Sequence, residues 1–165
     1  MTPAQFIKNL DDTLRDIDKF ARKDAPRIAG KIAVDHFKKN FQEGTEGFVN
    51  DGLKKWSEVN RRTGGKIDKK GRYVQNKAKG ADRTRPILTG RTGALARSLE
   101  KPEIADNQVT ISSNLPYAEA HNDGTTTAGR NKNVVIPQRQ FMGESKELNE
   151  LIINEINRKL NTILK

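Results

Sequence analysis

The sequence predicts an α+β fold, in which a small antiparallel sheet packs with N-terminal and C-terminal helices. A long basic loop is predicted between the N-terminal helices and the strands. Three observations support this prediction. Apolar residues recur at helical spacing near both ends of the chain, short strand-like segments follow in the second half, and residues 44–86 show no sustained periodicity. With 165 residues, the chain is expected to form a single domain over residues 1–165.

A first helix is predicted over about residues 3–22. Thr2 is a good N-cap, Pro3 suits the first helical position, and Gln5 completes a capping box. One apolar stripe follows at helical spacing, formed by Phe6, Leu10, Leu14, Ile17 and Ala21. The opposite face is charged, so this helix should be amphipathic.

A second helix is predicted to begin near Asp24, with Pro26 in its first turn, and to stop near Gly44. Its apolar face is broad, and His36 is expected at the border of that face. Only a residue or two separate this helix from the first. The two should therefore form either a helical hairpin or a kinked pair.

Residues 44–86 are predicted to be a mobile or assembly-ordered basic loop, because so long a stretch without regular structure is usually functional or disordered. Between Arg61 and Arg91 the chain carries eleven Lys or Arg and two Asp, a net charge of +9. The rest of the chain has 20 basic and 19 acidic residues, which is nearly neutral. The basicity of the protein therefore belongs to one segment.

Regular structure is expected to resume after this loop. Thr89 or Thr92 can cap a short helix, and residues 103–105 and 108–113 should form a β-hairpin. Residues 117–121 suggest another short helix, and 125–133 a polar loop. A third strand is predicted at 134–136 and a final helix at about 144–164. The apolar stripe of that helix is Leu148, Leu151, Ile152, Ile156, Leu160 and Ile163.

The composition gives no sign of an active site. The chain has no cysteine, and its two histidines are far apart in sequence, so neither a metal site nor a cofactor is expected. No serine lies in a G-x-S-x-G context, and a hydrolase is the weakest hypothesis. No apolar run approaches membrane-spanning length, and the N-terminus does not resemble a signal peptide. A soluble, non-enzymatic protein is therefore expected.

The basic segment is the strongest physical signal for a partner. Its cations could contact phosphates or an acidic surface of a neighbouring protein, or simply keep the loop solvated. These alternatives stay open at this point, although stacking of single strands is poorly supported because Tyr73 is the only aromatic residue in the run. The expected contact residues are Arg61, Arg62, Lys66, Lys69, Lys70, Arg72, Lys77, Lys79, Arg83 and Arg85.

Three ordered patterns carry a family resemblance. Asp51-Gly52 is followed by Trp56 and then by Arg62-Thr63, and residues 87–99 read I-L-T-G-R-T-G-A-L-A-R-S-L. Residues 117–124 read Y-A-E-A-H-N-D-G, and residues 136–143 read I-P-Q-R-Q-F-M-G. In order and spacing these resemble the phage virion morphogenesis family, also called phage tail completion proteins.

The third pattern is the most distinctive, because the family shows Y-A-x-x-H-x-x-G and then I-P-x-R-x-F-[LM]-G. This chain departs from the family in two places: two additional residues lie around Arg91-Thr92, and Gln140 replaces the usual second proline. The likeness covers the chain from about residue 50 to its end. The residues that carry it are Trp56, Leu88, Gly90, Leu95, Tyr117, His121, Gly124, Pro137, Arg139 and Phe141.

The resemblance implies a structural protein that completes the phage tail and joins it to the head, as one subunit of a ring. Its partners would be other tail and head-junction proteins and further copies of itself, with non-specific contact to genomic DNA and none to membranes. It would reside in the host cytoplasm during assembly and then in the tail or neck of the virion. Within the motifs, Tyr117 and His121 would fix a short helix beside the hairpin, and Gly124 would allow a turn. Arg139 would pair with a carboxylate either locally or across an interface, and Phe141 would anchor the end of the strand. The alternative is a small basic nucleic-acid-binding protein without catalytic activity.

Overall fold

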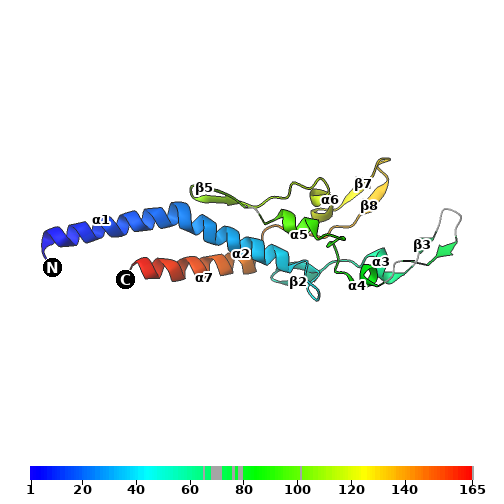
Figure 1. Cartoon of the computed structure of the whole chain (residues 1–165), viewed down its shortest axis with the longest axis horizontal. Coiled ribbons are helices and arrows are strands. Elements are labelled where there is room, and N and C mark those ends of the chain that lie inside the picture. Colours follow the sequence, from blue (N-terminus) through cyan, green and yellow to red (C-terminus); the bar gives the residue numbers. More distant parts are fainter. Residues whose placement is uncertain (65, 68–71, 76, 78–79, 101, 165) are drawn as a thin grey trace.

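The structure, a computed structural model, describes residues 1–64, 66–67, 72–75, 77, 80–100 and 102–164. The molecule is elongated, with a helical arm at one end and short hairpins and helices at the other (Figure 1). The predicted α+β class, with helices at both ends of the chain, is confirmed. No helix in the part of the chain that the structure describes combines the length and the apolar character needed to cross a membrane.

The arm begins with α1 (Pro3–Lys19), continues through a π-helical segment η1 (Phe20–Asp24) and ends with α2 (Ala25–Lys39). Thr2 and Gln5 form the predicted capping box, which satisfies N–H groups at the first turn. The three helical segments follow one another without a loop, so the hairpin alternative for the first two helices is wrong. At about 1.5 Å per residue, the rod spans about 55 Å.

The two halves of this rod differ in burial. No residue of α1 is buried, and its stripe residues Phe6, Leu10 and Leu14 expose 49–58% of their surface. Phe37 of α2, in contrast, exposes 5%. The final helix α7 (Lys146–Ile163) packs along α2 and returns toward the N-terminus (Figure 1).

All strands in the described residues form separate two-stranded antiparallel hairpins. These are β1 (Gly47–Asn50) with β2 (Gly52–Lys55), β3 (Lys66–Ile67) with β4 (Tyr73–Val74), β5 (Glu103–Ala105) with β6 (Gln108–Thr110), and β7 (Thr125–Ala128) with β8 (Val134–Ile136). The expected strand at 134–136 exists, but it pairs with β7 and not with the 103–110 hairpin. The prediction of one sheet with a third strand is therefore wrong, and β7 replaces part of the expected polar loop.

The segment 44–86 also contains more regular structure than its sequence indicates. It includes the β1–β2 and β3–β4 hairpins and two four-residue helices, α3 (Asn60–Thr63) and α4 (Ala81–Thr84). Such short elements do not establish a periodic pattern, and Gly52, with φ of 102°, lies in the tight turn of the first hairpin. The expectation of one long loop without regular structure is corrected accordingly. Its ordering on assembly stays a prediction.

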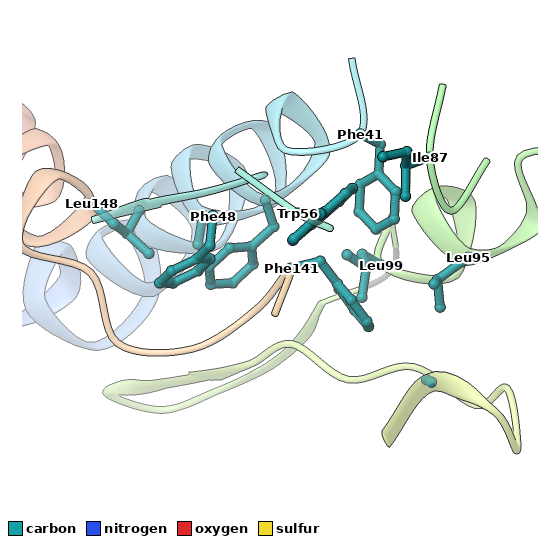
Figure 2. Close-up of a cluster of buried hydrophobic side chains, with 11 residues drawn as sticks. Phe41, Phe48, Trp56, Ile87, Leu95, Leu99, Phe141 and Leu148 are labelled. Atoms are coloured by element: carbon teal, nitrogen blue, oxygen red, sulfur yellow. The ribbon is translucent and has the colours of Figure 1, made fainter. Parts of the chain in front are cut away.

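The hydrophobic core lies where the arm meets the hairpins (Figure 2). Phe41 is at its centre, with its ring centroid 5.6 Å from that of Trp56 and 5.3 Å from that of Phe141. The short helices α5 (Ala94–Ser98) and α6 (Ala118–Asn122) join this core through Leu95 and Ala118. Residues that are distant in sequence thus share one small aromatic cluster.

A buried polar cluster lies beside the aromatic one and joins α2, β1 and α7. Asn40, fully buried, donates from Nδ2 to the carbonyl of Phe141 at 2.9 Å and accepts from the N–H of Val49 at 3.3 Å. Ser145, the N-cap of α7, donates to the carbonyl of Val49 at 2.9 Å. His36 exposes only 4% of its surface and is within this cluster, so it is not at the border of a helix face as expected.

Candidate functional site

The two halves of the third sequence motif are joined by main-chain contacts. The N–H of Arg139 donates to the carbonyl of His121 at 2.7 Å. The side-chain oxygen of Asn122 accepts from the N–H groups of Phe141 and Met142 at 3.0 and 3.1 Å. Helix α6 is therefore docked on the segment that follows β8. This contact explains why the two halves of the motif occur together.

Gly124 is required at the end of α6 for two reasons. Its φ of +76° is a conformation that side chains disfavour, and a Cβ there would lie 2.8 Å from the main-chain nitrogen of Gln138. The glycine thus permits both the turn and the close approach of the segment that carries Arg139.

The second motif forms a loop whose backbone is strained at Leu88, because glycine adopts positive φ freely but leucine does not. Leu88, Gly90 and Gly93 all have positive φ, at 62°, 57° and 64°. A non-glycine residue in this region costs about 1–2 kcal/mol. Thr89 holds the loop through its hydroxyl, which donates to the carbonyl of Pro86 at 2.7 Å. Strained backbone of this kind is concentrated at ligand-binding sites.

These two motifs enclose a pocket of about 410 Å³. Six motif residues line it, namely Leu88, Gly90, Leu95, Tyr117, His121 and Arg139. Three more residues line the pocket: Ala94 from α5, Arg61 from α3 and Val59, which directly precedes α3. The pocket therefore gathers residues from four separated parts of the chain, and it is the best-supported candidate site.

Arg61 and Arg139, of which Arg139 is buried, line this pocket, and main-chain carbonyls hold the guanidinium groups of both. Arg61 donates from Nε to the carbonyl of Asp82 at 2.9 Å and from Nη2 to the carbonyls of Arg85 and Pro86. Arg139 donates to the carbonyls of Ser57 and Glu58 at 3.2 and 3.3 Å. Among the described residues, no carboxylate oxygen forms an ion pair with either group.

Burial lowers the pKa values of three residues that line the pocket, namely Arg61, His121 and Arg139. Burial lowers the pKa of Arg61, and the nearby charge of Arg85 lowers it further. Burial also lowers the pKa of Arg139, which Glu58 partly opposes. Both arginines remain charged at neutral pH, since guanidinium pKa values are far above 7. In both arginines the largest cause of the shift is loss of solvation by burial.

His121 is the third pocket residue whose pKa is shifted. Burial lowers its pKa from the ordinary 6.5, and the charge of Arg139 lowers it further. Its ring lies edge-on to Tyr117, with centroids 6.0 Å apart, and its buried Nδ1 has no hydrogen-bond partner among the described residues. The imidazole is therefore mainly neutral near pH 7.

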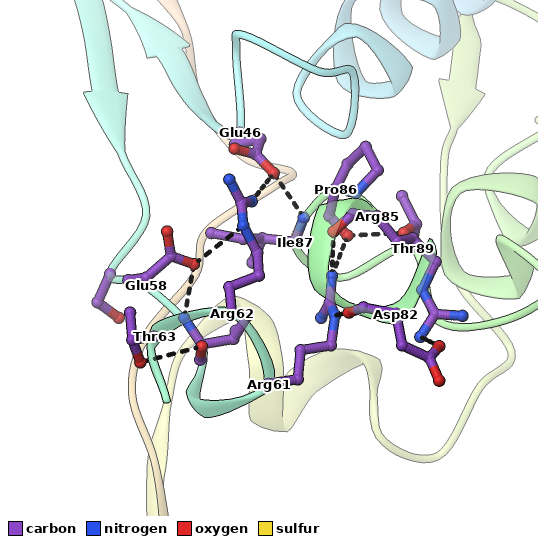
Figure 3. A network of polar contacts seen from close by, with 12 residues as sticks. Glu46, Glu58, Arg61, Arg62, Thr63, Asp82, Arg85, Pro86, Ile87 and Thr89 are labelled. Carbon is purple, nitrogen blue, oxygen red and sulfur yellow. Dashed lines mark hydrogen bonds and ion pairs between the residues drawn. The ribbon is translucent and has the colours of Figure 1, made fainter. Parts of the chain in front are cut away.

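Arg61 is the residue of the expected basic segment that lines this pocket, and several of its charged neighbours are paired within the chain (Figure 3). Arg62 forms ion pairs with Glu46 and Glu58, and Arg85 pairs with Asp82 at 2.7 Å. Glu46 also accepts from the N–H of Ile87 at 2.8 Å, so it joins α3 to the loop of the second motif. Together with Arg61, these arginines hold α3 and α4 against the body of the protein.

None of the other expected contact residues that the structure describes lines the pocket, and the remaining ones lie outside the described residues. Three are exposed: Arg72, Lys77 and Arg83. Lys66 belongs to β3. Three lie outside the described residues: Lys69, Lys70 and Lys79. The sequence pattern thus identified a charged region but did not distinguish internal from outward-facing cations.

Two features of the site were not found by sequence reasoning. Asn122 occupies a variable position of the motif, and only its place near the end of a short helix could have suggested a role. Arg61 was assigned to a basic loop, whereas it lines the pocket together with Arg139. The described residues contain no group of three or more His, Asp or Glu that could hold a metal ion.

Comparison with known proteins gives one match. A sequence model of the phage virion morphogenesis family matches residues 68–161, which include α5, α6, the motif segment of Arg139 and nearly all of α7. The matched range covers more than half of the chain. No curated protein and no solved structure matches the chain.

Proposed function

This chain belongs to the phage virion morphogenesis family, and on that basis we propose that it completes the tail of a tailed phage and joins it to the head. Family membership supports a structural role in phage assembly. The more specific role, as one subunit of a ring at the head–tail junction, is part of the proposal. The role requires no catalytic step and no cofactor.

The observation that carries this proposal is the uncovered apolar face of α1. The helix buries no residue in its own chain, yet Phe6, Ile7, Leu10 and Leu14 form apolar surface that is about half exposed. Helices gain most of their stability in proteins from packing of an amphipathic face. Contact with a neighbouring subunit or junction protein would supply that packing.

The hairpins give independent support for contact with neighbouring proteins. Each sheet in the described residues has only two strands, so each strand leaves one edge without a β partner. Exposed edges favour pairing with another chain unless they are covered. A ring would cover such surfaces through a repeated head-to-tail interface.

The proposal can be tested by complementation of a phage that lacks this gene. Wild-type protein should restore joined virions, whereas a Phe6→Glu and Leu10→Glu double variant should leave separate heads and tails in electron micrographs. Ile153→Glu is the matched control, because Ile153 is an exposed apolar residue (56%) on α7, outside both α1 and the hairpins. Normal joining without the protein would overturn the proposed role.

The alternative of a free nucleic-acid-binding protein receives less support from the geometry. Arg61, Arg62 and Arg85 are held by carbonyls or carboxylates of the same chain, which leaves fewer cations for phosphates. Phosphate contacts weaken steeply with salt. Fluorescence anisotropy with a labelled DNA duplex at low salt decides this point, and salt-sensitive binding by the isolated chain would favour the alternative.

A further inference from the structure

We propose that the pocket between α5, α6 and residues 86–93 binds a carboxylate side chain, flanked by apolar residues, from a neighbouring virion protein. This inference rests on the proposed assembly function and adds the site and the chemistry of one contact. It concerns the pocket that contains Arg61, His121 and Arg139.

The first argument is charge. Three carboxylates near the pocket are already paired, since Glu46 and Glu58 bind Arg62 and Asp82 binds Arg85. Arg61 and Arg139 have only carbonyl partners among the described residues. Two arginines therefore line one concave site, and neither forms a direct ion pair with a carboxylate among the described residues, although Glu58 acts on Arg139 and Asp82 on Arg61 from a greater distance. Carboxylates are the groups that guanidinium binds most strongly among protein side chains.

The second argument is preorganisation. The carbonyl groups of Asp82 and Pro86 hold the guanidinium of Arg61, and those of Ser57 and Glu58 hold the guanidinium of Arg139. The side chains are therefore fixed before a partner arrives, which reduces the entropy lost on binding. Exposed lysine side chains, in contrast, are mobile, and a ligand that bound them would have to restrict their motion.

The third argument is the character of the walls. Val59, Leu88, Ala94 and Leu95 supply apolar surface, and the volume of about 410 Å³ lies in the range of ligand pockets. A carboxylate with adjacent apolar groups matches both parts of this site. A DNA phosphate matches it less well, because its neighbouring phosphates would place further charge against the apolar wall.

His121 provides a reporter for occupancy. Its imidazole faces the same pocket and is kept neutral by burial and by Arg139. An anion bound between the arginines would offset the charge of Arg139, so the pKa of His121 should rise on binding. This change would not follow from a ligand that binds elsewhere on the protein.

The experiment uses the full chain and two blocked tripeptides, acetyl-Leu-Glu-Leu-amide and acetyl-Leu-Gln-Leu-amide. In NMR titrations, the Glu peptide should shift the resonances of Leu88, Leu95 and His121 and raise the pKa of His121. The Gln peptide should bind about tenfold more weakly or worse, because it lacks the charge-assisted bonds. No shift with millimolar Glu peptide would overturn the inference.

A pocket-filling variant separates binding from folding. Ala94→Phe places a large side chain at the pocket wall and leaves Arg61 and Arg139 in place, so the Glu peptide should no longer bind. Ala120→Phe is the matched control, because Ala120 lies on α6 and lines a different pocket. Binding should survive in the control. Equal unfolding midpoints of the two variants would show that the loss is local.

Two further outcomes would overturn the inference. Inorganic phosphate that competes as well as the Glu peptide would indicate a general anion site, and a DNA duplex that shifts the same resonances would indicate a nucleic-acid contact. The proposed function is tested separately by the α1 variants. If those variants still block joining while the Glu peptide fails to bind, only the pocket inference is lost.

Discussion

Trp56 donates its indole N–H to the main-chain carbonyl of Gln140 at 2.7 Å, across a separation of 84 residues. The same indole packs edge-on against Phe41 at the centre of the core. Gln140 lies between Arg139, at the pocket, and Phe141, which is fully buried. One side chain therefore joins the end of the first hairpin to the motif that forms the candidate site.

Replacement of Trp56 by Phe should lower the free energy of unfolding by about 1–2 kcal/mol, because the carbonyl of Gln140 loses its donor while most apolar contact is kept. Trp56→Ala should cost about 3–5 kcal/mol, since it also opens a cavity. Urea denaturation measures both changes. Equal costs for the two variants would argue against a role for the indole N–H.

Gly124→Ala should destabilise the protein more than Gly44→Ala. Both glycines have positive φ, at 76° and 86°, so each alanine carries about 1–2 kcal/mol of backbone strain. Only at Gly124 would the new Cβ also approach a neighbouring backbone atom, the nitrogen of Gln138. We expect at least about 1 kcal/mol of additional loss from this overpacking. Thermal unfolding of the two variants tests the difference, and equal losses would contradict it.

The lowered pKa of His121 predicts a pH dependence of stability. The native imidazole resists protonation, whereas the unfolded chain binds a proton near the ordinary pKa of 6.5. Unfolding therefore takes up a proton between the folded and unfolded pKa values, and stability falls as the pH drops below about 6.5. In His121→Asn this part of the pH dependence should disappear. Urea midpoints measured between neutral and mildly acidic pH check this, and identical slopes for both proteins would refute it.

Two leucine truncations compare the arm with the core. Leu10→Ala on α1 should change the unfolding free energy of the isolated chain by less than about 0.5 kcal/mol, because Leu10 is 49% exposed. Leu148→Ala on α7 should cost about 2–5 kcal/mol, because Leu148 is 7% exposed. Chemical denaturation gives both values. A large loss in Leu10→Ala would mean that α1 is packed in solution, for instance by self-association.

The terminal helices were predictable because their signals are local. The capping box at Thr2 and the long apolar stripes are properties of adjacent residues, and the structure confirms both helices. The partner of the strand at 134–136 was not predictable, because β7 reads Thr-Thr-Thr-Ala and has no apolar alternation. The strand with which a short segment pairs depends on which segments the rest of the fold brings together.

The pocket could not be predicted from the sequence, although the sequence analysis had named most of the residues that line it. Motif matching identified Leu88, His121 and Arg139 as a set, but gave them structural roles in separate elements. Their convergence depends on contacts such as the main-chain bond between Arg139 and His121, which no local pattern encodes. Charge counting likewise could not show that Arg62 would be paired with Glu46.

The π-helical segment η1 determines the rotation of α1 about the axis of the arm. An α-helix turns by about 100° per residue, so a one-residue change within Phe20–Asp24 would rotate all of α1 by that angle about the rod axis. The composition of α1 and its length would not change. The direction in which the apolar face of α1 points is therefore controlled by the five residues that follow α1, and a single-residue deletion there would turn the same surface toward a different neighbour.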